Sequence, residues 1–118
     1  HRDPASQIVD PLLDDQSMYF DTPAGVVVLL GCAHAGVIHI LEHVQTLANG
    51  RPIRAVLGGM HLGKATDARL QWVIQHMRKF DPRLLVPMHC TGPRAAAALW
   101  AAFPNACRPG GAGAVFDF

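Results

Sequence analysis

The fold is decided by the stretch VVVLLGCAHAG at residues 26–36. Its first five positions are valine or leucine, and such an unbroken apolar run is typical of a central strand that is covered on both faces. From Ala35 onward the apolar residues recur with the period of an α-helix, which Asn49 and Gly50 would close. The apolar positions of this helix are Val37, Ile40, Leu41, Val44, Leu47 and Ala48. The stretch therefore predicts a buried strand, a short loop that contains His34, and a helix.

Two similar units follow along the chain. Residues 53–57, apolar except for Arg54, and the apolar run at residues 84–88 predict two further strands. A helix is expected after each of them, one with Thr66 as its N-cap and one that starts near Thr91 with Pro93 in its first turn. Successive strand and helix units indicate the α/β class, in which mostly parallel strands form one layer and helices cover it.

Shorter β-favouring runs lie at the two ends of this pattern. Residues 18–20 precede the first buried strand, and the Pro and Gly within residues 21–25 predict a β-hairpin between the two. Apolar residues alternate at positions 114–118, which predicts a closing edge strand. We expect residues 1–17 to be an irregular N-terminal segment and residues 18–118 to form a single α/β domain.

The composition excludes several classes of protein. The chain has 118 residues, of which 50% are hydrophobic, and a formal net charge of +1. This apolar content suffices for one core, and the weak charge offers no patch for nucleic acid or for a membrane surface. The longest apolar run is far shorter than the roughly 20 residues of a membrane helix. The three cysteines are widely spaced and odd in number, so we expect a reducing, cytoplasmic compartment rather than a disulfide framework.

Three of the seven histidines occupy equivalent positions. His34, His61 and His89 each follow a predicted strand, at intervals of 27 and 28 residues. Parallel strands place their carboxyl ends at one edge of a sheet, where the ligand sites of open α/β sheets form. Neutral imidazole is a common zinc ligand, and catalytic zinc usually takes three protein ligands and a water molecule. We therefore predict a metal site on these histidines, with substrate contact or support of a ligand as the alternative for His61.

Residues beside these histidines are candidates for binding an anionic substrate. Cys90, Thr91 and Gly92 stand where a helix begins, and free backbone N–H groups at such a position attract anions. We also expect Thr91 to be an ordinary helix N-cap, since capping one donor leaves the others available for an anion. We expect Cys32 and Cys90 to be either small buried hydrophobic residues or thiols that act as a ligand or a nucleophile. Asp15 precedes the first strand, either in a solvated turn or in a loop that reaches the metal edge.

Four short strings carry a resemblance to a known family: DDQ at 14–16, GCAHAG at 31–36, GGMHL at 58–62 and HCTG at 89–92. Together they resemble the metallo-β-lactamase-fold hydrolases, in particular the branch of the dihydropterin-(ribofuranosyl)aminobenzene phosphate synthase-like proteins. The αββα sandwich of that family has two similar halves, and its motif His-x-His-x-Asp-His, which belongs to the first half, does not occur in this chain. The resemblance therefore implies the C-terminal half alone, as does His1 in place of an initial Met. It puts His34 and His89 at metal-ligand positions and His61 at a site position.

The resemblance implies part of a metal-dependent, dizinc hydrolase that acts on an anionic substrate such as a phosphoester. Zinc is the implied cofactor, with Mn, Fe or Mg as alternatives. None of the three buried strands is followed by a carboxylate, so a bridged two-metal site is incomplete here and the chain alone is expected to be inactive. The implied partners are the missing N-terminal half or a second copy of the chain. Two alternatives remain, a pterin-type synthase that uses the same metal edge and a non-catalytic binding or assembly module.

Overall fold

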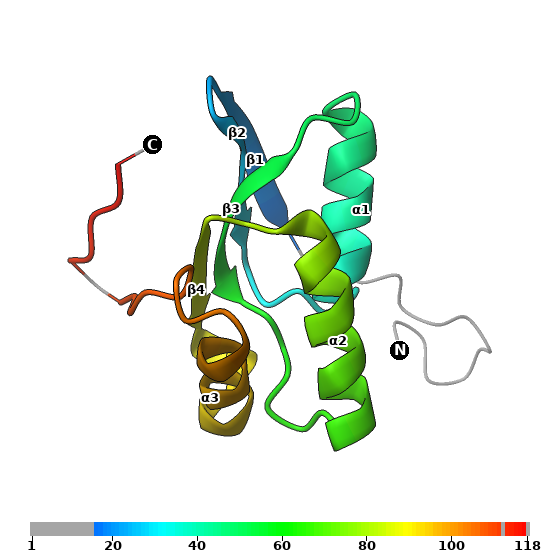
Figure 1. Ribbon diagram of the computed structural model, residues 1–118, viewed down its shortest axis with the longest axis vertical. Coiled ribbons are helices and arrows are strands. Elements are labelled where there is room, and N and C mark those ends of the chain that lie inside the picture. The colour runs from blue at the N-terminus through cyan, green and yellow to red at the C-terminus, as the bar shows by residue number, and fades with distance from the viewer. Residues whose placement is uncertain (1–15, 112, 118) are drawn as a thin grey trace, which may run out of the picture.

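A computed structural model of the protein describes residues 16–111 and 113–117, the side chain of His89 excepted. The strands form one four-stranded sheet in the order β1-β2-β3-β4. β1 (Ser17–Thr22) pairs antiparallel with β2 (Gly25–Leu30), whereas β3 (Ile53–Gly59) pairs in parallel with both β2 and β4 (Leu84–Met88). The predicted hairpin and the predicted α/β layer are therefore confirmed (Figure 1).

Three helices connect or follow the parallel strands. α1 (Val37–Leu47) joins β2 to β3, α2 (Asp67–Phe80) joins β3 to β4, and α3 (Pro93–Ala102) follows β4. α1 and α2 lie on one side of the sheet (Figure 1). Their apolar faces pack against alternate residues of the strands and form the main core. None of the helices within the described residues is long and apolar enough to cross a membrane.

The burial of α1 and α2 follows the predicted periodicity in the main, but Ile38 of α1 is buried without having been predicted, and Ile40, which was predicted, is only half-buried. Thr66 caps α2 as expected, because its hydroxyl accepts a hydrogen bond from the Arg69 amide at 3.1 Å. Leu47, predicted on the buried face of α1, is instead 52% exposed in the last turn of the helix. The fully buried side chains of the two helices are Val37, Ile38, Leu41, Val44, Leu70, Val73, Ile74 and Met77.

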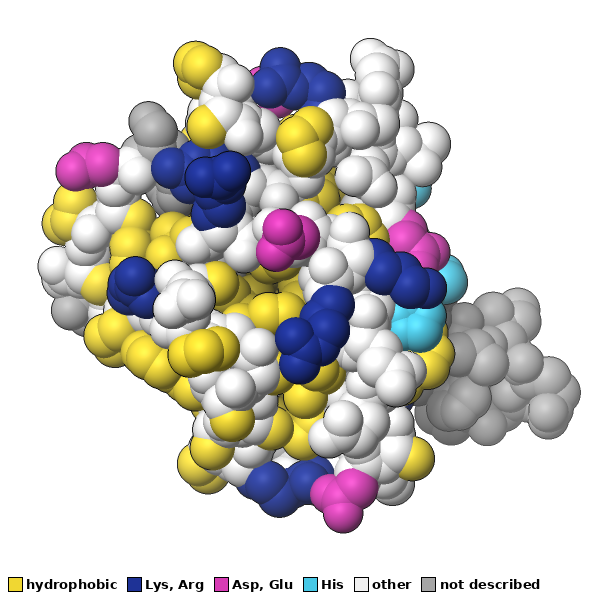
Figure 2. Space-filling view, viewed as in Figure 1, with side chains coloured by type: hydrophobic (Ala, Val, Ile, Leu, Met, Phe, Trp, Pro, Cys, Tyr) yellow, Lys and Arg dark blue, Asp and Glu magenta, His cyan; other side chains and the backbone are white. Residues whose placement is uncertain are grey.

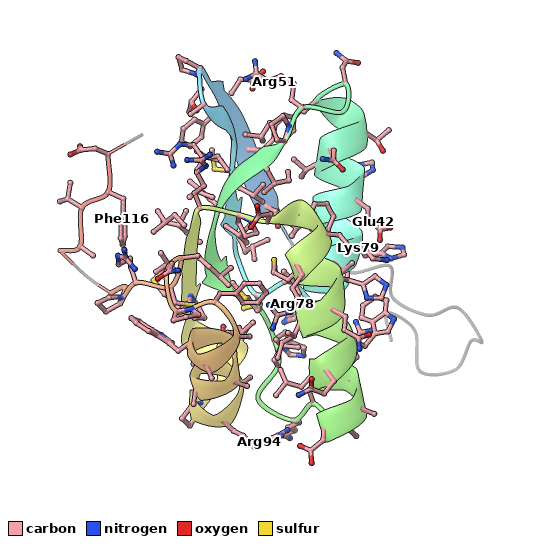
Figure 3. The ribbon with its side chains drawn as sticks, viewed as in Figure 1. Glu42, Arg51, Arg78, Lys79, Arg94 and Phe116 are labelled. Carbon is pink, nitrogen blue, oxygen red and sulfur yellow. The ribbon has the colours of Figure 1, made fainter. Side chains whose placement is uncertain are left out.

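The other face of the sheet is partly covered. A second buried cluster there consists of Val27, Ala55, Leu57 and Val86, and Phe116 of the C-terminal segment packs against it. Figure 3 shows Phe116 on the side of the sheet opposite to α1 and α2. The C-terminal segment thus covers the β3 and β4 part of this face.

Near β1 the same face reaches the surface. The pairing of Met18 with Leu29 and of Phe20 with Val27 puts these side chains on it. Met18 is 67% exposed, Phe20 42% and Leu29 36%. Figure 2 shows hydrophobic side chains at the surface on the side of the C-terminal segment. We call Met18, Phe20 and Leu29 the open sheet face; at Leu29 the prediction that β2 is covered on both faces is wrong.

The predicted closing edge strand at residues 114–118 is also wrong for its described part. Residues 114–117 form no strand. The outer edge of β4 is instead occupied by residues 106–108, since the Leu85 amide donates to the Ala106 carbonyl at 2.9 Å and the Leu85 carbonyl accepts from the Arg108 amide at 3.1 Å. With this edge bonded, the alternating apolar residues cover the face of the sheet rather than extend it.

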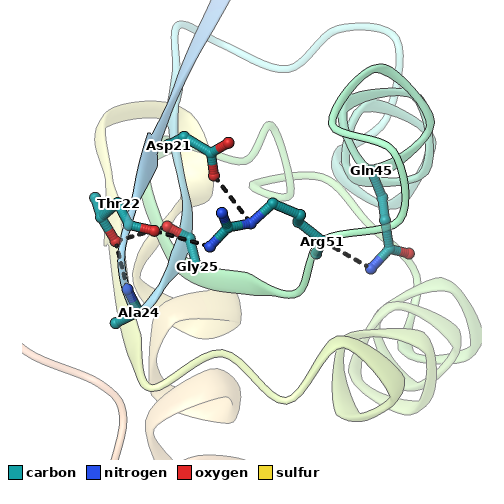
Figure 4. A network of polar contacts seen from close by, with 6 residues as sticks. All are labelled: Asp21, Thr22, Ala24, Gly25, Gln45 and Arg51. Carbon is teal, nitrogen blue, oxygen red and sulfur yellow. Dashed lines mark hydrogen bonds and ion pairs between the residues drawn. The ribbon is translucent and has the colours of Figure 1, made fainter.

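A polar network fixes the hairpin at the sheet edge opposite to the carboxyl ends of the parallel strands (Figure 4). The Arg51 guanidinium pairs with the Asp21 carboxylate at 3.2 Å and donates to the Thr22 carbonyl at 2.9 Å. The Gln45 amide donates to the Arg51 carbonyl at 3.3 Å. This network ties the β1–β2 turn to the segment that leads from α1 into β3.

Candidate functional site

The carboxyl ends of β2, β3 and β4 meet at one edge of the sheet, as the parallel register requires. Hydrogen bonds join the loops that follow them: the Gly59 amide donates to the Gly31 carbonyl at 3.0 Å, and the Cys90 thiol to the Cys32 carbonyl at 3.4 Å. A Cβ atom on Gly59 would lie 2.5 Å from the Gly31 oxygen. Glycine is therefore required for the loops to approach one another this closely.

His34 and His61 come together at this edge although they are 27 residues apart in the sequence. Their ring centroids are 4.5 Å apart at an interplanar angle of 67°. Ala33 and His61 have backbone φ angles of 57° and 53°, in the left-handed region that non-glycine residues rarely occupy. Such conformations cost about 1–3 kcal/mol each and concentrate at functional sites. Both loops are thus held in strained conformations at the position of the paired rings.

An open cavity of about 590 Å³ surrounds the two rings. Cys90 contributes to its wall from the loop after β4, and Lys64 and Arg69 contribute from the loop after β3 and the first turn of α2. Neither Lys64 nor Arg69 is among the site residues predicted from the sequence. The sequence signal for them is weak: one cationic residue stands on each side of the Thr66 cap, shortly after His61.

Thr91 has a structural place that differs from the predicted N-cap. It is the last residue of a 3-10 turn, η1 (His89–Thr91). α3 begins directly after Gly92, which has a φ of 82°, a conformation that glycine adopts without strain. The Thr91 side chain is 1% exposed. Its hydroxyl accepts from the Met60 amide at 3.1 Å and donates to the Met88 carbonyl at 2.8 Å. Thr91 therefore joins the loop that carries His61 to the loop that carries His89.

The other predicted site residues are placed as follows. Cys32 and Cys90 are half-buried near the cavity and form no disulfide, and Gly92 is half-buried at the start of α3. Asp15 lies outside the described residues, so its place in a turn or near the metal edge stays a prediction. The backbone of His89 lies in η1 directly after β4, while its side chain is not described. The anion-binding roles of Cys90, Thr91 and Gly92 remain predictions.

The donors at this edge are chemically suited to a divalent metal ion. Two neighbouring imidazoles, His34 and His61, provide nitrogen ligands of the kind that zinc prefers. Among the described residues, no group of three His, Cys, Asp or Glu side chains is close enough together to hold a metal. A third protein ligand for such an ion would have to come from outside that set; the backbone of His89 lies in the loop after β4, at the same edge of the sheet.

The fold has a match among solved structures. A crystal structure of a metal-dependent hydrolase of the β-lactamase superfamily superposes with a TM-score of 0.81 at 29% sequence identity, over 86% of this chain and 40% of that chain. The resemblance to the metallo-β-lactamase-fold hydrolases is thereby confirmed, and the α/β sheet with its helices is a portion of that fold. No protein family model matches the sequence.

Two curated proteins are similar to this chain in sequence. The 7,8-dihydropterin-6-methyl-4-(β-D-ribofuranosyl)-aminobenzene-5'-phosphate synthase of Methanocaldococcus jannaschii is 26% identical over 85 residues, which are 72% of this chain and 29% of that protein. An uncharacterized protein of the same organism is 35% identical over 66 residues, 56% of this chain and 24% of that protein. The chain thus spans less than a third of either relative.

Proposed function

We propose that this chain carries part of the active site of a metal-dependent hydrolase, with His34, His61 and His89 as ligands of one divalent ion, zinc first among the candidates. The observation that carries the proposal is the contact of the His34 and His61 rings at the carboxyl edge of the sheet. When bound, such an ion polarises the scissile group and lowers the pKa of a water molecule. A second ion would need further ligands, which we propose come from the rest of the fold.

The protein residues have distinct parts in this proposal. The three imidazoles act as neutral nitrogen donors, and the Thr91 hydroxyl holds the loops of His61 and His89 at a fixed separation. We propose an anionic substrate such as a phosphoester, because the described residues that line the cavity include two cations and no carboxylate. The half-buried Cys90 thiol donates to a backbone carbonyl, which favours a role in shaping the wall of the cavity.

Zinc binding to the 118-residue chain tests the ligand set. We expect His34→Ala and His61→Ala each to weaken zinc binding, measured by equilibrium dialysis, on the order of tenfold or more. His43→Ala is the matched control, since His43 is an exposed residue of α1 outside the cavity. Equal zinc binding by the wild type and both site variants would remove the basis of the proposal. Hydrolysis of a phosphodiester is then measured after the chain is mixed with a polypeptide that supplies the rest of the fold.

A synthase is the second candidate, and the relative named as a dihydropterin synthase favours it. In that reaction a metal at the same edge would assist the departure of pyrophosphate from a pterin-like substrate while an arylamine attacks. Formation of a coupled product from an arylamine acceptor distinguishes this candidate from hydrolysis, in which water takes the place of the arylamine and the pterin-like alcohol is released together with pyrophosphate.

We further propose that the open sheet face is covered by a partner, namely the remainder of a metallo-β-lactamase fold. Met18 and Leu29 expose apolar surface there, and the similar hydrolase is more than twice as long as the matched region. Light scattering tests this: a monomer that binds the complementary part supports it, and a stable dimer indicates a second copy instead. We propose a cytoplasmic location, supported by the three cysteines, none of which forms a disulfide.

A further inference from the structure

Two cationic side chains give the cavity a charged end. Lys64 and Arg69 both line it, together with His34 and His61. The acid nearest to them in sequence, Asp67, is engaged elsewhere, because its carboxylate pairs with Arg94 at 2.6 Å. The charges of Lys64 and Arg69 are therefore not neutralised by a described residue of the cavity wall.

The Arg69 guanidinium is held in a defined orientation. Its carbon atom lies 4.4 Å from the centre of the Trp72 ring, over the ring face. Trp72 in turn stacks on His76, with ring centroids 4.0 Å apart. The backbone of Arg69 is fixed as well, since its amide donates to the Thr66 hydroxyl. A guanidinium supported in this way loses little side-chain entropy when it binds a ligand.

The loop that carries Lys64 is tied to α3. Arg94, near the start of α3, donates to the Ala65 carbonyl and to the Asp67 carboxylate (Figure 3). This pair of contacts spans the beginning of α2 and the residue next to Lys64. On the opposite wall, a Cβ atom on Gly36 would lie 3.4 Å from an Arg69 nitrogen. Gly36 and Arg69 both line the cavity, so the guanidinium lies beside the start of α1.

We propose that Arg69 and Lys64 form an anion subsite that binds a phosphate group of the substrate. The planar guanidinium offers two parallel N–H donors to two phosphate oxygens, and the ammonium of Lys64 adds a mobile point charge. The subsite deepens the proposed function and rests on it for the identity of the substrate. Binding of the phosphate group itself needs only these two side chains, so it is measurable without a metal.

The test is a titration of the metal-free, full chain with inorganic phosphate, followed by NMR at constant ionic strength. We expect Arg69→Gln to weaken phosphate binding about tenfold, and Lys64→Gln to weaken it less. Arg78→Gln is the matched control, because Arg78 is also exposed on α2 and also lies over an aromatic ring, that of Phe103 at 5.1 Å, but outside the cavity. Its phosphate affinity should equal that of the wild type.

Several outcomes separate this inference from the proposed function. Equal phosphate affinity of the wild type and Arg69→Gln, or an equal loss in Arg78→Gln, overturns the subsite. Phosphate binding that survives in His34→Ala while zinc binding is lost supports it, because the two ligands then use different residues. Zinc binding unaffected in His34→Ala would count against the metal site, yet the subsite would still stand if Arg69→Gln alone loses phosphate.

Discussion

Replacement of Thr91 by valine tests whether its hydroxyl joins the two site loops. The hydroxyl makes two hydrogen bonds, from the Met60 amide at 3.1 Å and to the Met88 carbonyl at 2.8 Å, in a side chain that is 1% exposed. Each is worth about 1 kcal/mol, and a buried amide without a partner adds a desolvation cost, so we expect a loss of about 2–3 kcal/mol. Thr91→Val keeps the branched shape, which leaves the hydrogen bonds as the main difference.

The assay is urea unfolding followed by circular dichroism, with two comparisons. Thr91→Ser retains the hydroxyl and should lose only about 1 kcal/mol through the missing methyl group. Thr46→Val removes an exposed hydroxyl that donates to the Glu42 carbonyl at 3.1 Å, and should change stability by about 0.5 kcal/mol or less. If Thr91→Val were as stable as Thr46→Val, the hydroxyl would not be holding the loops together.

Two further predictions concern backbone geometry and a buried thiol. Gly92→Ala and Gly50→Ala both place a side chain at positive φ, 82° and 80°. At Gly92 the new Cβ would lie 2.8 Å from the Gly63 Cα, whereas at Gly50 it would meet nothing within 4 Å. Urea unfolding should therefore show a larger loss of stability for Gly92→Ala than for Gly50→Ala. Burial raises the pKa of the Cys107 thiol, and the nearby Arg108 opposes this only in part. Because the unfolded thiol ionises first, the stability of the wild type should fall more steeply than that of Cys107→Ala as the pH rises past about 8.5; parallel pH profiles would contradict this.

Much of the fold could be predicted because the signals are local. The unbroken apolar run of β2 and the helical spacing of Leu70, Val73 and Met77 each indicate one element, and the structure contains them. The edge strand predicted at residues 114–118 was wrong because alternating apolar and polar residues occur in any extended segment that has one covered side, whether or not it pairs with a strand. Phe116 uses that side to cover the sheet face, and only the bonded outer edge of β4 shows that pairing was excluded there.

The candidate site could be predicted where it depends on strand ends and not where it depends on loops. His34 and His61 meet because the parallel register brings the ends of β2 and β3 together. Arg69 faces the same cavity through the direction of α2, which no spacing in the sequence specifies. The role of Thr91 was also hard to predict, because a threonine before Gly-Pro is typical of a helix N-cap. In the structure Thr91 belongs to a 3-10 turn, and its hydroxyl accepts a hydrogen bond from the Met60 amide instead.

Zinc titration of the chain, with the histidine ring signals observed by NMR, tests the metal site most directly. We expect the ring signals of His34, His61 and His89 to change together and to saturate at a single common equivalence point. The signals of the other four histidines should not move. Changes confined to the exposed histidines of α1, or independent changes of His34 and His61, would contradict a metal site at the carboxyl edge of the sheet.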